Sequence, residues 1–538
     1  MGTYEEGMIG MAEKTVIVIG GGITGLSAAY YLQKQARAQG VPLRVQLFER
    51  DARVGGKVDT ELFDGFVVEK GPDSFLARKA AAVHLCRELG LQDDLVGTNP
   101  RAKKTYIWHG GKLHRIPDGL NIGIPTQFVP FATTGLLSVS GKLRAAMDLV
   151  LPRSDDSGDR SLGGFLARRL GDEVVDRMAE PLLAGIYAGD SRNLSLRATF
   201  PQFEQLEKQY GSLIRGMLAQ AKAAGKRAVP GAGPAPVSET GRAPAVEGSA
   251  SVREKSLPQS VFLSLRGGLI QLVNRLAEVL GPGVIHTSTA VREIRQVTVD
   301  QPGAMLTADQ AEAMLSRDQT GASTGDIRPP ARYRVMMETG DVFEADAVVV
   351  TIPAYDAARI LPQSFEPATV LGKIPYASVA TVAMAFHASS IVHPLDGTGF
   401  VVPKQEGRNI TACTWVSSKW LHTAPKDKVL LRCYVGRAGE EAIVDEPDES
   451  ILRKVRQDLN DSMGIQVDPI FTRITRWRRS MPQYTVGHLE RLDAFQKEVK
   501  RQFPGLFFAG AGHTGLGIPD CIQQGKNTAE QAIEHLAL

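Results

Sequence analysis

The sequence predicts an α/β protein in which a discontinuous Rossmann-like nucleotide-binding domain carries an inserted α+β domain and an inserted helical subdomain. A β-branched run at residues 15–19 leads through a glycine turn into a helical pattern from Ile23 to about Gln39. A second apolar run follows at 45–48 and ends in an acidic residue. Residues 505–538 repeat the order of strand, glycine-rich turn and helix, so we expect both ends of the chain to build one domain.

The composition narrows the functional class. A chain of 538 residues exceeds what one hydrophobic core usually accommodates, so several domains are expected. Basic and acidic residues nearly cancel, 62 against 59, which argues against nucleic acid as the main partner. The four cysteines form no CxxC pair, which argues against a disulfide framework and a thiolate metal site. We therefore expect no metal.

The sequence has no pattern typical of a signal peptide or a transmembrane span. Residues 1–12 contain two glutamates and no long apolar run. The longest uncharged stretch, 119–141, is interrupted by Pro125 and Pro130. The cysteine usage and these absences predict a cytoplasmic protein, and they leave peripheral contact with a membrane open.

Two stretches without aromatic residues, 221–258 and 301–332, indicate a flexible linker and a flexible insertion. With them, the predicted order is as follows: nucleotide-binding domain 12–100, α+β substrate domain 101–140, helical subdomain 141–258, nucleotide-binding domain 259–355, substrate domain 356–477 and nucleotide-binding domain 478–538.

The sharpest motif is the run Gly20-Gly21-Gly22-Ile23-Thr24-Gly25, which matches GxGxxG between a strand and a helix. In this fingerprint the glycines permit a tight turn, close approach of a pyrophosphate and close packing of helix on strand. Glu49 stands at the end of the second strand, where its carboxylate accepts hydrogen bonds from ribose hydroxyls. The sequence thus predicts a dinucleotide site.

The fingerprint alone does not distinguish FAD from NAD, but a second glycine doublet, Gly55-Gly56, follows closely behind the acid. Such a doublet lets the backbone approach an extended cofactor a second time, which favours FAD. A literal GxGxxG at 510–515 is not a second site, because too little chain follows it for a returning strand. We expect instead that the helix after Gly517 directs its N-terminus at the flavin ring, where it stabilises negative charge on the reduced ring.

With these motifs assembled, the chain resembles the flavin-dependent porphyrinogen oxidases of haem biosynthesis, within the wider monoamine-oxidase-like flavoprotein superfamily. The resemblance covers nearly the whole chain, and its carriers are residues 68–75, 180–190, 262–269 and 517–522. The string EPLLAGIYAGD at 180–190 is the most specific of them. The chain is most similar to the Gram-positive branch, whose members act on coproporphyrinogen III.

The resemblance implies a set of cofactor contacts: Gly20, Gly21, Gly22, Ile23, Thr24, Gly25, Glu49, Arg50, Gly56, Lys57, Gly71, Pro72, Asp73 and Ser74. It also places Val291 at the adenine side and the following residues near the ring: Trp477, Ala511, Leu516, Gly517 and Ile518. Val291 and Trp477 have alternative roles, the first as a core residue and the second as a cover over apolar surface.

The resemblance implies a six-electron oxidation of coproporphyrinogen III to coproporphyrin III in three two-electron steps. Hydride passes to flavin N5, and molecular oxygen reoxidises the flavin with release of hydrogen peroxide. Protoporphyrinogen IX and an amine remain alternative substrates, and a flavin-bearing module that carries tetrapyrrole without turnover is an alternative of another class. A transient contact with the ferrochelatase-type enzyme of the pathway is also implied.

No residue pattern indicates a catalytic dyad or triad, which agrees with a reaction in which the cofactor carries the difficult step. The candidate substrate-binding residues are Lys70, Ile186, Tyr187 and Arg266. Lys70 adjoins the turn expected near the ring and has a charge that suits substrate carboxylates, although a solvated turn lysine fits the same pattern. Ile186 and Tyr187 fit equally well as residues of a helix core.

Overall fold

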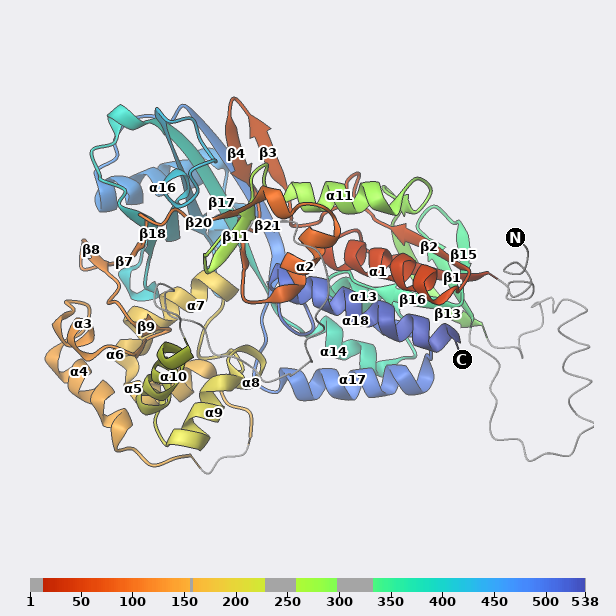
Figure 1. Cartoon of the computed structure of the whole chain (residues 1–538), viewed down its shortest axis with the longest axis horizontal. Coiled ribbons are helices and arrows are strands. Elements are labelled where there is room, and N and C mark those ends of the chain that lie inside the picture. The colour runs from red at the N-terminus through yellow and green to blue at the C-terminus, as the bar shows by residue number, and fades with distance from the viewer. Residues whose placement is uncertain (1–12, 155–157, 228–257, 298–331, 538) are drawn as a thin grey trace, which may run out of the picture.

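The computed structural model of the chain describes residues 13–154, 158–227, 258–297 and 332–537. Figure 1 shows an elongated molecule with three parts: a nucleotide-binding fold at the end where both termini lie, a block of helices at the opposite end, and a large sheet beside them. The predicted α/β architecture with a Rossmann-like domain is confirmed.

A parallel five-stranded sheet is the centre of the nucleotide-binding fold, with the strand order β12-β2-β1-β16-β22. Its strands are β1 (Lys14–Ile19), β2 (Leu43–Phe48), β12 (Ile285–His286), β16 (Ala347–Val350) and β22 (Leu506–Phe508). They come from the two ends and the middle of the chain, within the segments 12–100, 259–355 and 478–538 that the sequence assigns to this domain.

The two faces of this sheet carry different layers, because successive side chains of a strand point to opposite sides. Val16 and Val18 pack with four helices: α1 (Ile23–Gln39), α2 (Ala80–Glu88), α11 (Ile270–Leu280) and α18 (Ile518–Ala537). Ile17 and Ile19 pack with β13 (Val291–Val297), β14 (Arg332–Met337), β15 (Val342–Ala345), α13 (Ala354–Ile360), α14 (Thr369–Gly372) and α17 (His488–Gln502). The expected helix from Ile23 to Gln39 is confirmed.

The large sheet has seven strands in the order β21-β17-β20-β19-β18-β7-β8. Their bounds are β7 (Lys104–His109), β8 (Lys112–Arg115), β17 (Tyr376–His387), β18 (Gly397–Val401), β19 (Ile410–Trp415), β20 (Lys428–Val435) and β21 (Phe471–Pro482). One face packs on α16 (Asp448–Met463) and the other on the hairpin of β3 (Thr60–Phe63) and β4 (Phe66–Glu69). The hairpin belongs to the N-terminal segment, so it connects this sheet to the nucleotide-binding fold.

The block of helices has a core of its own, formed mainly by leucine, with phenylalanine and isoleucine next in number. Its elements are α3 (Phe128–Thr133), α4 (Val139–Ala146), α5 (Leu162–Leu170), α6 (Asp172–Val174), a π-helical turn at Val175–Ala179, α7 (Glu180–Tyr187), α8 (Leu196–Thr199), α9 (Pro201–Tyr210), α10 (Leu213–Arg227), β9 (Leu120–Asn121) and β10 (Ile124–Pro125). Short elements elsewhere are β5 (Phe75–Leu76), β6 (Leu95–Gly97), β11 (Phe262–Leu265) and α15 (Val416–Lys419).

Several elements differ from the expected segments. Helix α4 crosses the predicted boundary at 140/141, and α13 crosses the one at 355/356. Helix α10 continues to Arg227, so the first residues of the predicted linker 221–258 are helical, because alanine has the highest helix propensity. Strand β14 includes Arg332, the last residue of the predicted insertion, and β21 crosses the predicted boundary at 477. Residues 228–257 and 298–331 lie outside the described residues, and the other predicted domain boundaries stay predictions.

Candidate functional site

The glycine turn between β1 and α1 leaves open space in front of a helix N-terminus. A Cβ on Gly25 would lie 1.9 Å from the carbonyl oxygen of Gly20, so Gly25 is required for packing. A Cβ on Gly22 would meet no protein atom within 4 Å. Gly22 is also the N-cap of α1 and provides no side-chain hydrogen bond to it. The backbone N–H groups of the first turn are therefore available to an anion.

Glu49 lies beside this turn, as its place in the sequence predicts. Its Oε2 accepts a hydrogen bond of 2.6 Å from the Gly21 backbone N–H, and its Oε1 accepts one of 2.9 Å from Asp51. The backbone of Glu49 is held in place, because its carbonyl oxygen accepts a hydrogen bond from the backbone N–H of Thr289. Thr289 lies two residues before Val291. Val291 begins β13 and packs against the core that contains Phe48.

The glycine doublet approaches the turn from a third segment. Gly55 pairs with Gly22 as a parallel bridge and donates its N–H to the Gly21 carbonyl oxygen at 2.8 Å. A Cβ on Gly56 would lie 3.4 Å from the Cα of Gly22. Lys57 follows, and its half-buried ammonium has no hydrogen-bond or ion-pair partner among the described residues; burial lowers its pKa.

The C-terminal helix closes the other side of the site. A Cβ on Gly525 would lie 2.5 Å from the Thr24 carbonyl oxygen, so α18 and α1 pack closely near their N-termini. Cys521, in the first turn of α18, interacts with both Thr24 and Lys57, and burial raises the pKa of its thiol to about 11. The preceding loop is fixed by Tyr484, whose hydroxyl donates a 2.6 Å hydrogen bond to the Ala511 carbonyl oxygen.

These features fit FAD. The uncapped helix N-terminus with the open space at Gly22 suits a pyrophosphate, and the Lys57 ammonium supplies a cation that no carboxylate of the described residues pairs with. The second helix N-terminus, at Ile518, suits the electron-accepting edge of a flavin ring. Among the residues described in the structure, no cluster of histidine, cysteine or carboxylate side chains could hold a metal ion.

A turn from Lys70 to Ser74 lies between the nucleotide-binding fold and the large sheet. A Cβ on Gly71 would lie 1.9 Å from the Lys57 carbonyl oxygen and 3.6 Å from the Trp477 ring, so the turn is packed between them. Asp73 and Ser74 are bonded to each other at 2.6 Å. The Asp73 carboxylate also pairs with Lys419 and Arg432, both at 3.2 Å. These cations hold the pKa of Asp73 well below its ordinary value despite its burial. The Asp73 carboxylate is therefore already neutralised by ion pairs within the protein.

The four candidate substrate residues are not all brought together. Tyr187, at the end of α7, is buried, and both its burial and the nearby Asp520 carboxylate of α18 raise its pKa. Ile186, beside it, is 43% exposed. Lys70 places its ammonium 3.1 Å from Asp59. Arg266 directly follows β11 and is exposed. Burial lowers the pKa of the His422 imidazole, and Arg266 lies close enough to lower it further.

The remaining predicted residues are distributed as follows. Ile518 packs in the same core as Ile23, and Leu516 packs against the core of the helical block. Pro72 and Gly517 are half-buried. Arg50 lies apart from the turn: its side chain is exposed and its Nη1 lies 3.3 Å from Asp356.

Comparison with known proteins identifies the family. The model of the flavin containing amine oxidoreductases matches residues 23–533, which is almost the entire chain. The chain belongs to this family. Members use flavin, so FAD is the cofactor and the protein is an oxidoreductase.

Two relatives within the family are similar over their whole length. The coproporphyrinogen III oxidase of Bacillus subtilis (strain 168) is 39% identical over 97% of this chain and 99% of its own. The coproporphyrinogen III oxidase of Staphylococcus aureus (strain NCTC 8325 / PS 47) is 36% identical over 97% of this chain and 100% of its own. The crystal structure of a putative protoporphyrinogen oxidase from Exiguobacterium sp. 255-15 aligns with a TM-score of 0.77 at 36% identity. The alignment covers 98% of this chain and 100% of that one.

Sequence reasoning missed the side chains that hold the Lys70–Ser74 turn: Arg432 on β20 and Thr381 on β17. Both reach the turn from the large sheet, more than 300 residues along the chain. One signal was present, because Arg432 is a charged residue inside the apolar strand pattern KVLLRCYV. A buried charge in such a strand needs partners, but the sequence does not say where they are.

Proposed function

We propose that this protein is an oxygen-dependent oxidase that converts coproporphyrinogen III to coproporphyrin III in haem biosynthesis. The supporting observation is that the similarity to coproporphyrinogen III oxidases extends over 97% of the chain. It therefore includes the large sheet and the helical block as well as the cofactor motifs shared by the wider family. Each two-electron step consumes one oxygen molecule and releases one hydrogen peroxide.

Bound flavin supplies the hydride-accepting chemistry. The residues of the chain bind and orient both molecules: the first turn of α1 and Lys57 hold the pyrophosphate, Glu49 the ribose, and the turn at Gly71 with Trp477 the ring. Tyr187 and Ile186 present an apolar face to the macrocycle. Apolar contact with the macrocycle would displace water from this face and keep the substrate carbon close to the reacting ring.

Product identification tests the proposal. We expect the purified FAD-loaded enzyme, mixed anaerobically with coproporphyrinogen III, to bleach its flavin, and aerobic turnover to yield coproporphyrin III with three equivalents of peroxide. Protoporphyrinogen IX and a panel of primary amines serve as parallel substrates. Bleaching by amines alone would establish an amine oxidase, and tetrapyrrole binding without peroxide release would establish a carrier.

Lys70 is the proposed partner of a substrate carboxylate. Its ammonium is half-buried, and the one partner it has among the described residues is Asp59, which a propionate can displace. We expect Lys70→Ala to raise KM about tenfold, equivalent to one charge-assisted hydrogen bond of about 1.4 kcal/mol. FAD affinity, measured by fluorescence titration, should change much less. Lys454→Ala, which removes a partly exposed lysine paired with Glu446 outside the segments assigned to cofactor and substrate, is the matched control. Equal loss of substrate and FAD binding in Lys70→Ala contradicts the assignment.

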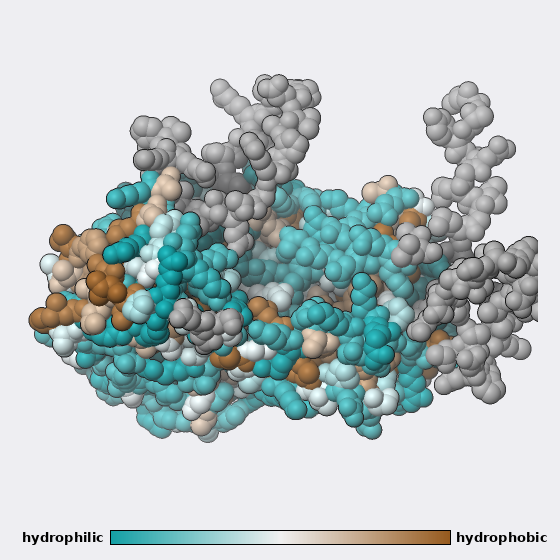
Figure 2. Space-filling model, turned by 90° about the horizontal axis from the view of Figure 1, so that it is seen from below, coloured by the Kyte–Doolittle hydropathy of each residue, from teal (hydrophilic) through white to brown (hydrophobic). Residues whose placement is uncertain are grey.

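We further propose a cytoplasmic enzyme that contacts the membrane through α3 and α4 and meets the ferrochelatase-type enzyme of the pathway transiently. No helix in the described part of the chain is long and apolar enough to cross a bilayer. Figure 2 shows apolar residues gathered at the end of the molecule formed by these helices. The exposed members are Phe128, Val129, Val139, Leu143, Met147 and Val150. The only acidic residue of 127–153, Asp148, is buried, while Lys142 and Arg153 remain available for anionic lipids.

Vesicle sedimentation tests this contact. We expect binding to vesicles containing anionic phosphatidylglycerol, and at least a tenfold loss for the pair Val129→Glu and Leu143→Glu, because each places a charge where apolar contact is needed. Val392→Glu, a substitution at a fully exposed valine outside the helical block, is the control. Equal sedimentation of the wild type and the double variant would refute membrane contact by this surface.

A further inference from the structure

Three consecutive carbonyl groups of the turn beside the flavin site are held by side chains of the large sheet. Arg432 Nη1 donates to the carbonyl oxygens of Glu69 at 2.9 Å and Gly71 at 3.0 Å. The carbonyl oxygen of Lys70, between them, accepts from Trp477 Nε1 at 2.8 Å and from Thr381 Oγ1 at 3.1 Å. The donors come from β20, β21 and β17, so the sheet fixes the orientation of every peptide in this segment.

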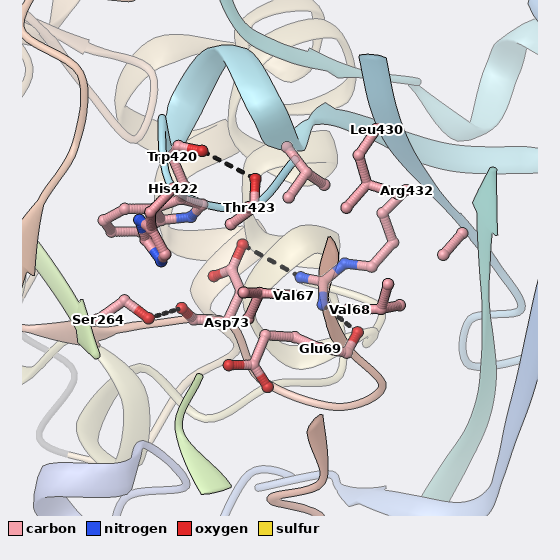
Figure 3. A pocket seen from close by; sticks show the side chains of 12 residues that line it. Val67, Val68, Glu69, Asp73, Ser264, Trp420, His422, Thr423, Leu430 and Arg432 are labelled. Carbon is pink, nitrogen blue, oxygen red and sulfur yellow. Dashed lines mark hydrogen bonds and ion pairs between the residues drawn. The ribbon is translucent and has the colours of Figure 1, made fainter. Parts of the chain in front are cut away.

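Arg432 itself has little freedom to move. It is 4% exposed, its Nε donates to the Tyr434 hydroxyl at 2.8 Å, and its Nη2 lies 3.2 Å from Asp73. Figure 3 shows its guanidinium lying between Asp73 and the backbone of Glu69. The strand pattern explains the direction, since Leu430 and Arg432 share the face that packs on β4, while Leu431 and Cys433 share the opposite one.

The orientation of these carbonyls determines where the N–H groups point. In a trans peptide the carbonyl and the following N–H point in opposite directions, so the Gly71 N–H points away from the donors that hold Lys70. The Lys70 N–H is already bonded to the Asp59 carbonyl oxygen at 2.9 Å, and Pro72 has no N–H. Within the described residues the Gly71 N–H has no acceptor, although the residue is half-buried. Such a donor requires a partner.

We propose that the Gly71 N–H donates a hydrogen bond to the polar N5/O4 edge of the flavin ring. Thr381 and Trp477 are positioning residues that hold the carbonyl of the same peptide, and Arg432 is a positioning residue that fixes the peptides on either side of it. Gly71 lies against Lys57, whose side chain reaches the first turn of α18, so the turn and the helix N-terminus flank the same region. A donor at this edge stabilises the negative charge that accumulates on reduction. The inference depends on the FAD site described above and deepens the proposed oxidase function.

The test uses the FAD-loaded protein and measures the flavin directly, without a porphyrinogen. In Arg432→Met the carbonyl groups of Glu69 and Gly71 lose their hydrogen-bond donor. Thr381→Val is a substitution of nearly equal volume, and in it the Lys70 carbonyl loses one of its two hydrogen-bond donors. We expect both variants to shift the visible flavin absorption and to make the midpoint potential more negative. Reduction by dithionite should slow at least tenfold in Arg432→Met and less in Thr381→Val. Arg432→Lys should recover part of the effect, because an ammonium still serves one carbonyl.

Lys419→Met is the matched control, because it removes the other cation beside Asp73 and touches no carbonyl of the turn. Its flavin spectrum and potential should equal those of the wild type. Lower thermal stability of Arg432→Met and Thr381→Val with an unchanged spectrum and potential would overturn the inference and leave a purely structural clamp. If Arg432→Met does not fold, Thr381→Val decides by the same readout. Failure of the wild type to oxidise coproporphyrinogen would refute the proposed function only.

Discussion

Gly22→Ala is expected to abolish FAD retention and activity while the apoprotein stays folded. The backbone of Gly22, with φ −69° and ψ 175°, accepts alanine, and its Cβ would meet no protein atom within 4 Å. The added methyl would occupy the space through which a pyrophosphate approaches the N–H groups of α1. We expect FAD affinity to fall about 100-fold, or about 2.7 kcal/mol. Fluorescence titration of the apoprotein with FAD measures it.

Gly25→Ala provides the comparison within the same turn. Its Cβ would lie 1.9 Å from the Gly20 carbonyl oxygen, so α1 and β1 would have to separate. Such overpacking costs about 3 kcal/mol, and thermal denaturation of the apoprotein should show it. The two variants therefore distinguish an effect on FAD binding, expected for Gly22→Ala, from an effect on protein stability, expected for Gly25→Ala. A Gly22→Ala protein that binds FAD like the wild type would show that the pyrophosphate does not approach here.

Asp148→Ala is expected to lower the free energy of unfolding by about 3 kcal/mol, because the buried Arg169 guanidinium loses its nearer carboxylate and keeps only Glu207, at 3.5 Å, as an ion-pair partner. Both side chains are fully buried, and Arg169 Nε lies 2.5 Å from Asp148. The same carboxylate accepts hydrogen bonds from the Ser212 hydroxyl and the Ile214 N–H, at 2.5 and 2.9 Å. One carboxylate thus holds the start of α10 against α5.

Urea denaturation of the FAD-loaded protein, followed by circular dichroism, measures this loss. Asp493→Ala removes one partner of an exposed pair, Asp493 with Lys497 at 2.6 Å, and should change the free energy by less than about 1 kcal/mol. Similar small losses in both variants would show that the buried network contributes no more than a surface pair.

The sequence determined the elements whose partners are close together along the chain. The glycine turn, the first residues of α1 and Glu49 lie within thirty residues, and their spacing is set by one βαβ unit, so pattern and geometry coincide. The second glycine doublet belongs to the same stretch. The string at 180–190 carried the resemblance, but the positions of Ile186 and Tyr187 relative to the cofactor stay predictions.

The tertiary structure alone decided how the cofactor domain and the large sheet meet. Sequence reasoning assigned Asp73 to the cofactor, whereas the structure engages its carboxylate with Arg432 and Lys419 from the other domain. Sequence reasoning considered only the side-chain charge of Lys70. In the structure, the large sheet holds the backbone carbonyl group of Lys70 by hydrogen bonds. The physical reason is that a strand pattern specifies which face a side chain occupies, and not which distant segment covers that face. Only the folded chain pairs Arg432 with a turn 361 residues away.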